Sequence, residues 1–243
     1  MATNVLTNCK AWLAEYDLSS DLNAVALDQG VEQQEATTFG VGTKITKPGL
    51  LTLKAALVGF LNTGSGLSEE FLSSKLGLVD VPFTAAPTTG AEGEPAYSFQ
   101  ADLAKFDPLA GDKVGDMAKI AVDLAASSSK VVRGTILHNA ARVATGTGTI
   151  FNLGAVAAGQ SLYGILHVPA ISGGPTVTIK VQSAPTVGFA APVDRLTFTA
   201  VTTKTAQFLA LLGAITDAFW RVTWTFVGGA GPSITFVVNV GIL

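Results

Sequence analysis

The clearest pattern in the chain is an alternation of apolar and polar residues near its C-terminal end. Every second residue from Trp220 to Phe226 is large and apolar, and a second alternating run extends from Ile234 to Val240. A period of two is typical of strands that bury one face. The linking residues 228–233 contain three glycines and a proline, which favour a turn. We therefore expect a β-hairpin whose apolar face is covered by other strands, so that the chain ends inside a sheet.

Similar runs recur along the chain between segments that contain Gly or Pro. A half-exposed strand is expected within residues 23–39, after a turn near residues 18–23. Residues 206–213 fit either a strand or a helical turn. The remaining runs predict further strands, and those beyond residue 148 have the regular spacing of a β-sandwich. These runs are residues 51–60, 96–106, 113–124, 130–138, 149–153, 161–168, 176–183 and 195–201.

One segment has the features of a helix. Residues 67–76 begin with Ser68, which can cap a helix, and continue with Glu69 and Glu70 where the helix dipole favours negative charge. Gly77 then supplies a stop. The sequence predicts a short helix here that covers a sheet.

The following residues show no periodicity. Val81 to Pro95 contains three prolines and two glycines. Such a composition opposes regular pairing. We expect a long, mobile loop that can become ordered against a neighbouring molecule.

These patterns predict an all-β chain with one short helix. The composition changes at residues 144–148, ATGTG, which we take as a domain boundary. Residues 1–143 are then expected to form a β-sandwich or barrel that carries the helix. Residues 144–243 are expected to form an antiparallel β-sandwich.

The composition indicates assembly. Apolar residues make up 48% of the 243 residues and charged residues only 14%. No apolar run is long enough to span a membrane, and no signal peptide is visible. The single cysteine, Cys9, excludes an internal disulfide framework.

Because no apolar run is long enough for a membrane span, the surplus of apolar side chains is expected to meet other copies of the chain.

The charge distribution argues against tight binding of nucleic acid. The first 143 residues carry 16 of the 18 acidic side chains and 11 of the 15 basic ones. Lysines and arginines form no cluster of the kind that phosphate binding requires.

The sequence contains no motif that indicates catalysis. His138 and His167 are its only histidines, and neither has a partner at metal-ligand spacing, so both are expected to be structural. There is no G-x-S-x-G motif. A Ser/His/Asp triad stays an open alternative, because such triads are defined by geometry and not by sequence spacing. Gly146-Thr147-Gly148 lacks the lysine of a phosphate-binding loop. We expect no catalytic, cofactor-binding or metal-binding residue, no cofactor and no enzymatic activity.

The aromatic residues allow two interpretations. Trp220, Trp224 and Tyr163 could form a platform for sugar stacking. The two tryptophans share the apolar face of their strand, which favours a place in the core. Arg221, on the opposite face, is expected to pair with Asp194 or Asp217.

Several segments resemble tail tube proteins of long-tailed bacteriophages. In that family an acidic turn and a strand end of the type TTFG precede a strand of the type PGL…L…L.GF. The matching residues are Asp17-Leu18-Ser19, Thr37 to Gly40 and Pro48 to Phe60. Residues 131–134 and 215–243 also look like segments of phage virion proteins. The resemblance covers the first 60 and the last 30 residues well, and the middle more loosely.

The resemblance implies a structural virion protein. Such subunits assemble into rings, commonly sixfold, that stack into a hollow tube through which the genome passes. The partners would be copies of the chain, other tail proteins and DNA in transit, with assembly in the host cytoplasm and no membrane. An acidic or neutral lumen would let DNA slide, so Glu32 and Glu35 are possible lumen residues. Residues expected at subunit or ring contacts are Val81, Pro82, Phe83, Pro87 and Pro95.

Two further functions stay open. A β-sandwich of this composition could decorate a phage capsid, as a trimer. It could also be a surface module that binds host glycans. In a tail tube, by contrast, the extra C-terminal sandwich would lie on the outside of the tube.

Overall fold

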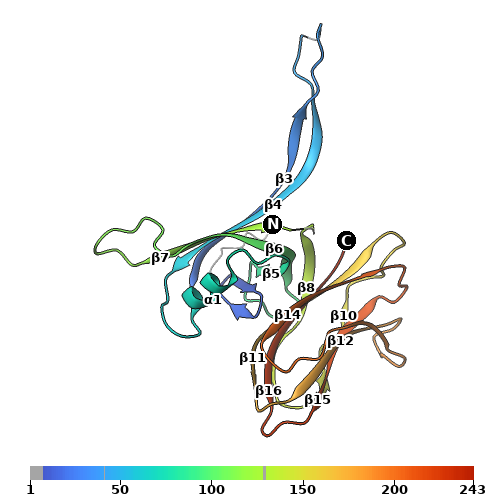
Figure 1. The fold of residues 1–243 in the computed structure, drawn as a ribbon. Helices are drawn as coiled ribbons and strands as arrows, with labels where there is room; N and C mark the ends of the chain where they lie inside the picture. Colours follow the sequence, from blue (N-terminus) through green and yellow to red (C-terminus); the bar gives the residue numbers. More distant parts are fainter. Residues whose placement is uncertain (1–7, 41, 128–129) are drawn as a thin grey trace. The chain divides into compact units, whose positions relative to one another are not determined.

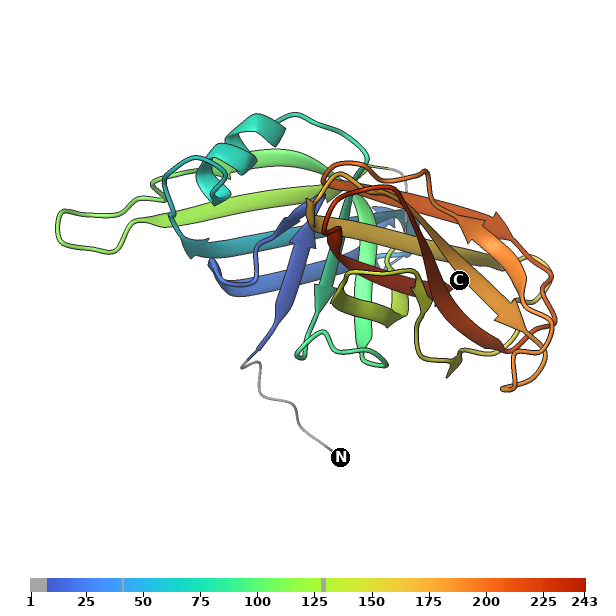
Figure 2. The ribbon, with the colours of Figure 1, turned by 90° about the horizontal axis from the view of Figure 1, so that it is seen from below.

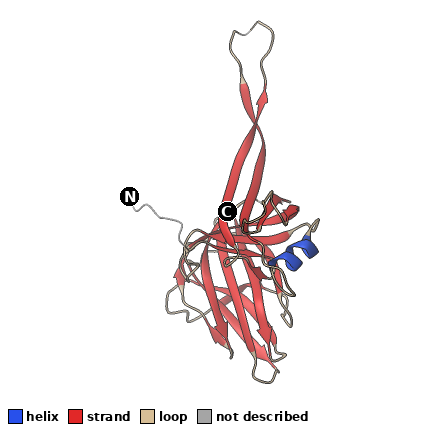
Figure 3. Cartoon of the chain, turned by 90° about the vertical axis from the view of Figure 1, so that its left-hand side faces the viewer, coloured by secondary structure: helices blue, strands red, loops and turns tan. Residues whose placement is uncertain are grey.

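The computed structural model describes residues 8–40, 42–127 and 130–243, and these are nearly all β-structure (Figures 1 and 3). One short helix interrupts the series of strands in the described residues. The all-β prediction is confirmed. The single α-helix is far too short to span a membrane, and no other described segment is a long apolar helix.

The chain divides into two compact units. The first contains Met1–Asp21, Val81–Gln100 and Val132–Leu243, and the second contains Leu22–Asp80 and Ala101–Val131. The chain therefore passes from the first unit to the second and back twice. The expected boundary between residues 143 and 144 falls inside the first unit.

Two sheets build the first unit. One has the order β14 (Thr205–Leu212), β11 (Ser161–Ser172), β16 (Ser233–Ile242), β8 (Val132–Arg142), the first half of β6 (Pro95–Asp107), β5 (Val81–Ala86), β1 (Lys10–Leu13) and β2 (Tyr16–Asp17). The other has the order β10 (Phe151–Asn152), β15 (Phe219–Val227), β12 (Thr176–Ala184) and β13 (Val193–Thr197), and β9 (Gly146–Thr147) also pairs with β15.

The two sheets enclose the main hydrophobic core of this unit. Alternate residues of β12 and β15 point inward and meet alternate residues of β11 and β16. Trp220 is fully buried, and the ring of Trp224 lies 5.6 Å from that of Phe236 in an edge-to-face arrangement. This confirms the interpretation of the two tryptophans as core residues. Their burial excludes the alternative of a sugar-stacking platform on these two residues.

The predicted C-terminal hairpin is also wrong. The two runs are strands, β15 and β16, but they do not pair with each other. β15 pairs with β12, whereas β16 lies between β11 and β8 in the opposite sheet. Their apolar faces meet across the core, and residues 228–232 connect the two sheets. The expectation that the last strand lies inside a sheet is confirmed.

The predicted loop from Val81 to Pro95 contains a strand. Residues 81–86 form β5, all six are buried, and four of them pair with β1. Beside β5 and β1, Trp12, Ala86, Ala96, Ile136 and Val237 form a second buried cluster in this unit. A strand that is buried on both faces has no alternation of apolar and polar residues, so the sequence pattern did not reveal it.

The second unit is a four-stranded antiparallel sheet with one helix. Its order is β3 (Leu22–Glu35), β4 (Thr46–Phe60), β7 (Lys119–Ala126) and the second half of β6. The helix α1 (Ser68–Lys75) lies against this sheet (Figures 1 and 2) and buries Leu72. The predicted helix is confirmed, but the Ser68 side chain makes no capping hydrogen bond. Residues 206–213 fitted either a strand or a helical turn, and residues 206–212 belong to strand β14.

Candidate assembly interface

The most exposed feature of the second unit is a long two-stranded arm. β3 pairs with β4 from Leu22 to Glu35, but β7 accompanies β4 only from Lys54 to Phe60. The outer parts, residues 29–35 of β3 and 46–53 of β4, therefore pair only with each other, and they project beyond the rest of their sheet (Figures 1 and 3). Both edges of this arm present unpaired backbone groups.

The arm continues an apolar face that is buried nearer its base. Leu53, Ala55 and Leu57 of β4 are buried, and the next residues on the same face are the cross-strand pair Val31 and Leu51. Each of these two side chains is 43% exposed. Further large apolar side chains are exposed along the arm and its tip, namely Phe39, Ile45 and Leu50. Exposed large apolar side chains gathered on one projecting element are typical of a surface that another protein covers.

The opposite face of the sheet carries small side chains and paired charges. Asp28 lies opposite Lys54, and Ala26 lies opposite Ala56. Further along, Asp123 lies opposite both Ala56 and Lys105. All of these side chains are exposed. The face carries both signs of charge, so it offers no footprint for tight phosphate binding.

The two residues predicted to line a lumen lie on the arm. Glu32 and Glu35 are exposed in the outer part of β3. The Glu35 carboxylate is 3.4 Å from the ammonium group of Lys44. Their role as lumen residues stays a prediction.

The residues predicted for subunit contacts lie in the first unit. Val81, Pro82 and Phe83 are buried in β5, and Phe83 packs edge-to-face on Phe99 at 5.3 Å between ring centres. Pro87 follows β5 and Pro95 begins β6, and both are half-buried. These five residues belong to the first unit, whereas the arm belongs to the second. Their role in assembly also stays a prediction.

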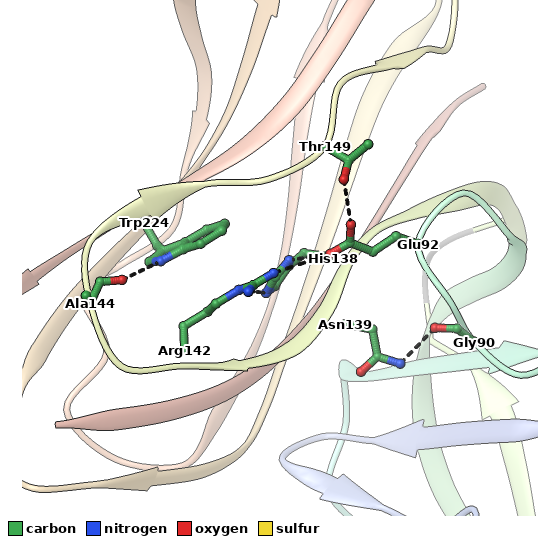
Figure 4. Close-up of polar contacts among 8 residues, drawn as sticks. All are labelled: Gly90, Glu92, His138, Asn139, Arg142, Ala144, Thr149 and Trp224. Carbon is green, nitrogen blue, oxygen red and sulfur yellow. Dashed lines mark hydrogen bonds and ion pairs between the residues drawn. The ribbon is translucent and has the colours of Figure 1, made fainter. Parts of the chain in front are cut away.

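The remainder of the predicted loop, residues 87–94, is held against β8 (Figure 4). The Asn139 side chain donates a 2.7 Å hydrogen bond to the Gly90 carbonyl group, and the Thr149 hydroxyl group donates one of 2.9 Å to the Glu92 carboxylate. Within the loop, Glu94 accepts hydrogen bonds from the Thr88 and Thr89 hydroxyl groups. These hydrogen bonds lower the pKa of Glu94, and the bond from Thr88 has the largest effect. They fix the shape of a segment that the sequence pattern indicated to be mobile.

His138 is the central residue of this attachment. Its imidazole is fully buried between Trp224 and Phe236, and its Nδ1 lies 2.7 Å from a carboxylate oxygen of Glu92. Arg142 Nε donates to His138 Nε2 at 3.3 Å, which places the imidazole proton on Nδ1, facing Glu92. Burial lowers the pKa of His138, Arg142 lowers it further, and Glu92 opposes both. The neutral imidazole is therefore a structural link.

The second histidine is also structural. His167 is fully buried, its Nδ1 lies 2.7 Å from the Ala14 carbonyl oxygen and its Nε2 lies 2.7 Å from the Thr84 hydroxyl group. Burial lowers its pKa to about 4. The described residues contain no group of His, Cys, Asp and Glu side chains arranged to hold a metal ion.

Arg221 makes neither of the two ion pairs expected for it. Asp217 accepts hydrogen bonds from Ser183 and Arg195, and Asp194 accepts them from Lys180 and Gln182. Both hydrogen bonds lower the pKa of Asp217, and the bond from Ser183 has the larger effect. The Arg221 guanidinium group instead contacts Gln182 and the ring of Phe189.

Sequence reasoning missed the exposed apolar residues of the arm as an interface. The pattern predicts a strand at residues 51–60, but it does not predict which element covers the Leu51 side chain. The apolar alternation of residues 51–57 begins three residues before the part of β4 that β7 accompanies, which runs from Lys54 to Phe60. Only the observed pairing shows at which residue of β4 the neighbouring strand β7 ends.

Comparisons with known proteins give similarity at the level of the backbone alone. No protein-family description and no curated protein matches the sequence. Among solved structures, the chain is similar to the virion of a native gene transfer agent particle, with a TM-score of 0.39 and 11% identity over 54% of this chain and 98% of that chain. It is also similar to the sheath-tube complex of an extracellular contractile injection system, with a TM-score of 0.41 and 16% identity over 54% of this chain and 90% of that chain.

A third similar structure spans nearly the whole chain. It is the Dit protein of SPP1, described as a hub adsorption apparatus in phages that infect Gram-positive bacteria. The TM-score is 0.37 and the identity 12%, over 97% of this chain and 99% of that chain. By their names, all three structures belong to virions, phage adsorption machinery or injection systems. Their TM-scores are too low to establish a shared fold.

Proposed function

We propose that this protein is a structural subunit of a phage tail that assembles with copies of itself into stacked rings around a DNA-conducting channel. It binds and positions other subunits and carries out no chemical reaction. The observation that carries the proposal is the arm of β3 and β4, which has two unpaired edges and an exposed apolar face. The resemblance of residues 17–19, 37–40 and 48–60 to tail tube proteins supports the same function.

The arm requires partners on physical grounds. An isolated two-stranded ribbon is marginally stable in water, because it cannot bury a hydrophobic face. Unpaired strand edges readily accept a strand from another molecule. A neighbouring copy that pairs with the arm and covers Val31 and Leu51 meets both needs. Because the contact joins different surfaces of the two copies, it generates a ring or a helical stack.

The opposite sheet face suits the channel side of such a ring. Ala26 and Ala56 add only small side chains, and Asp28 and Lys54, which lie opposite each other, carry opposite charges. DNA phosphates would then meet no continuous basic surface and would release few counterions, so the genome would not be retained. Glu32 shares this face with Ala26 and Asp28, and its predicted role as a channel residue is part of this proposal. Glu35 lies three residues further along β3, so its side chain lies on the opposite face, and its role as a lumen residue stays a prediction.

The arm can be tested by removing its apolar face while keeping its strand propensity. In a variant with Val31→Thr and Leu51→Thr, the β-branched side chains preserve the hairpin, but the face no longer excludes water. We expect assembly, measured as material that sediments in an ultracentrifuge, to require about tenfold more protein. Circular dichroism should show unchanged strand content.

A matched control uses exposed apolar residues away from the arm. Val187 is 63% exposed and Val193 is 43% exposed, both in the first unit. The variant with Val187→Thr and Val193→Thr should sediment as the wild type does. Equal assembly of the arm variant and the wild type would contradict the proposal.

A further inference from the structure

The outer face of the sheet β10-β15-β12-β13 contains an arginine held in one orientation. Arg221 alternates with the core residues Trp220 and Val222, so its side chain lies on the face turned away from the core. Its Nε donates a 3.0 Å hydrogen bond to the side-chain oxygen of Gln182, and its guanidinium carbon lies 4.3 Å from the centre of the Phe189 ring. The two contacts fix the plane of the group and leave its terminal amino groups for another partner.

The ring beneath the arginine is itself held in an unusual conformation. Phe189 has a φ of +50°, a left-handed conformation that is rare for a bulky residue, and its side chain is 7% exposed. Such strain persists only where the surroundings enforce it, and it is concentrated at functional positions. Here it places an aromatic ring under a cation.

The charge of Arg221 has no carboxylate partner among the residues that the structure describes. The nearest acidic side chain in the network, Asp194, is bound by Lys180 Nζ at 2.6 Å and by Gln182 Nε2 at 2.7 Å. Lys180, Asp194, Gln182 and Arg221 therefore form one continuous chain of polar contacts along the face. A half-buried guanidinium group of fixed orientation is suited to two parallel hydrogen bonds with a carboxylate.

The neighbouring groups favour a sugar as the carrier of this carboxylate. Each oxygen of Asp194 accepts one of these hydrogen bonds and has a second lone pair, which a sugar hydroxyl group can use. Thr178 and Thr225, opposite each other on the same face, add hydroxyl groups. Asp194 repels any anion, but a sugar carboxylate carries one negative charge whereas a phosphate carries up to two, so the carboxylate is repelled less.

We propose that this face binds an acidic saccharide, with the sugar carboxylate on the terminal amino groups of Arg221 and sugar hydroxyl groups on Asp194 and the threonines. The site differs from the stacking platform expected on Trp220 and Trp224, because it depends on a cation and uses its aromatic ring as a support. It lies in the first unit and is independent of the assembly proposed for the arm.

The test is calorimetric titration of the full chain with oligogalacturonate, oligoglucuronate and oligosialic acid, each also as its methyl ester. We expect at least one acid form to bind the wild type and its ester to bind no more than weakly. Arg221→Gln should weaken binding about tenfold or more, because a charge-assisted pair of hydrogen bonds is lost. Arg221→Lys should restore only part of the affinity, because an ammonium group lacks the planar fork.

The control variant is Arg133→Gln, which removes an exposed arginine from β8 and should bind as the wild type does. Thermal unfolding should show that Arg221→Gln is folded. The proposal is overturned if Arg221→Gln binds as the wild type does, if none of the three acids binds, or if the esters bind equally well. Tighter binding of inorganic phosphate than of every acid would also overturn it, since the site would then be one for phosphate.

Discussion

At the scale of single residues, buried polar groups connect segments that are distant in sequence. The Ala14 carbonyl oxygen, His167, Thr84, Ser98 and Asn239 form a chain of hydrogen bonds of 2.7 to 2.8 Å inside the first unit. All four side chains are fully buried. Each hydrogen bond of this chain has one donor and one acceptor if His167 donates from Nδ1 and accepts at Nε2. This arrangement requires a neutral imidazole. Sequence could predict that His167 is structural, but its partners come from strands far along the chain.

This network makes stability depend on pH. The pKa of His167 is about 4 in the folded protein, against 6.5 for a free side chain, so the unfolded chain binds the proton more tightly. The free energy of unfolding should therefore fall as the pH decreases from 6.5 towards 4, by roughly 3 kcal/mol from this residue alone. The lowered pKa of His138 acts in the same direction.

Urea denaturation at pH 7 and pH 4.5 measures the effect. His167→Asn keeps a donor for the Ala14 carbonyl group and cannot gain a proton, so its unfolding free energy should be lower at pH 7 but change less with pH. An equal pH dependence of the variant and the wild type would show that His167 does not titrate in this way.

At the scale of elements, the sequence predicted where strands lie along the chain better than it predicted which strands pair with each other. Alternation from Trp220 to Phe226 and from Ile234 to Val240 correctly indicated two strands with a buried apolar face, although β16 buries both of its faces from Phe236 to Gly241. It could not indicate that β15 and β16 face each other across the core, because alternation reports which side chains are buried and not which strand lies alongside. Residues 81–86 show the converse case: with both faces buried, β5 has no alternation to detect.

Close pairing of β8 and β16 depends on a glycine. Gly134 lies opposite Gly241, and a Cβ atom at Gly134 would lie 2.7 Å from the Val240 carbonyl oxygen, which is backbone and cannot swing aside. Gly134→Ala should therefore lower the free energy of unfolding by about 1–3 kcal/mol. Gly42→Ala is the matched control, because nothing lies within 4 Å of its Cβ position. Chemical denaturation of the two variants should separate them, and equal stability would argue against tight packing at Gly134.

At the scale of the whole molecule, only part of the candidate interface could be read from sequence. The low content of charged residues indicated assembly, and the strand that contains Leu51 was predicted. The interface itself depends on how far β7 covers β4, which is a property of the folded sheet. Glu32 and Glu35 were identified as exposed residues of a strand, and the structure places them on the arm.

The central claim is that the apolar face of the arm is covered by another copy of the chain. Electron microscopy of the purified wild-type protein over a range of concentrations tests it most directly. We expect stacked rings with an open channel of uniform bore, in which the arm of each subunit contacts its neighbour. A dispersed monomer at every concentration, or isolated trimers with free arms, would contradict the account.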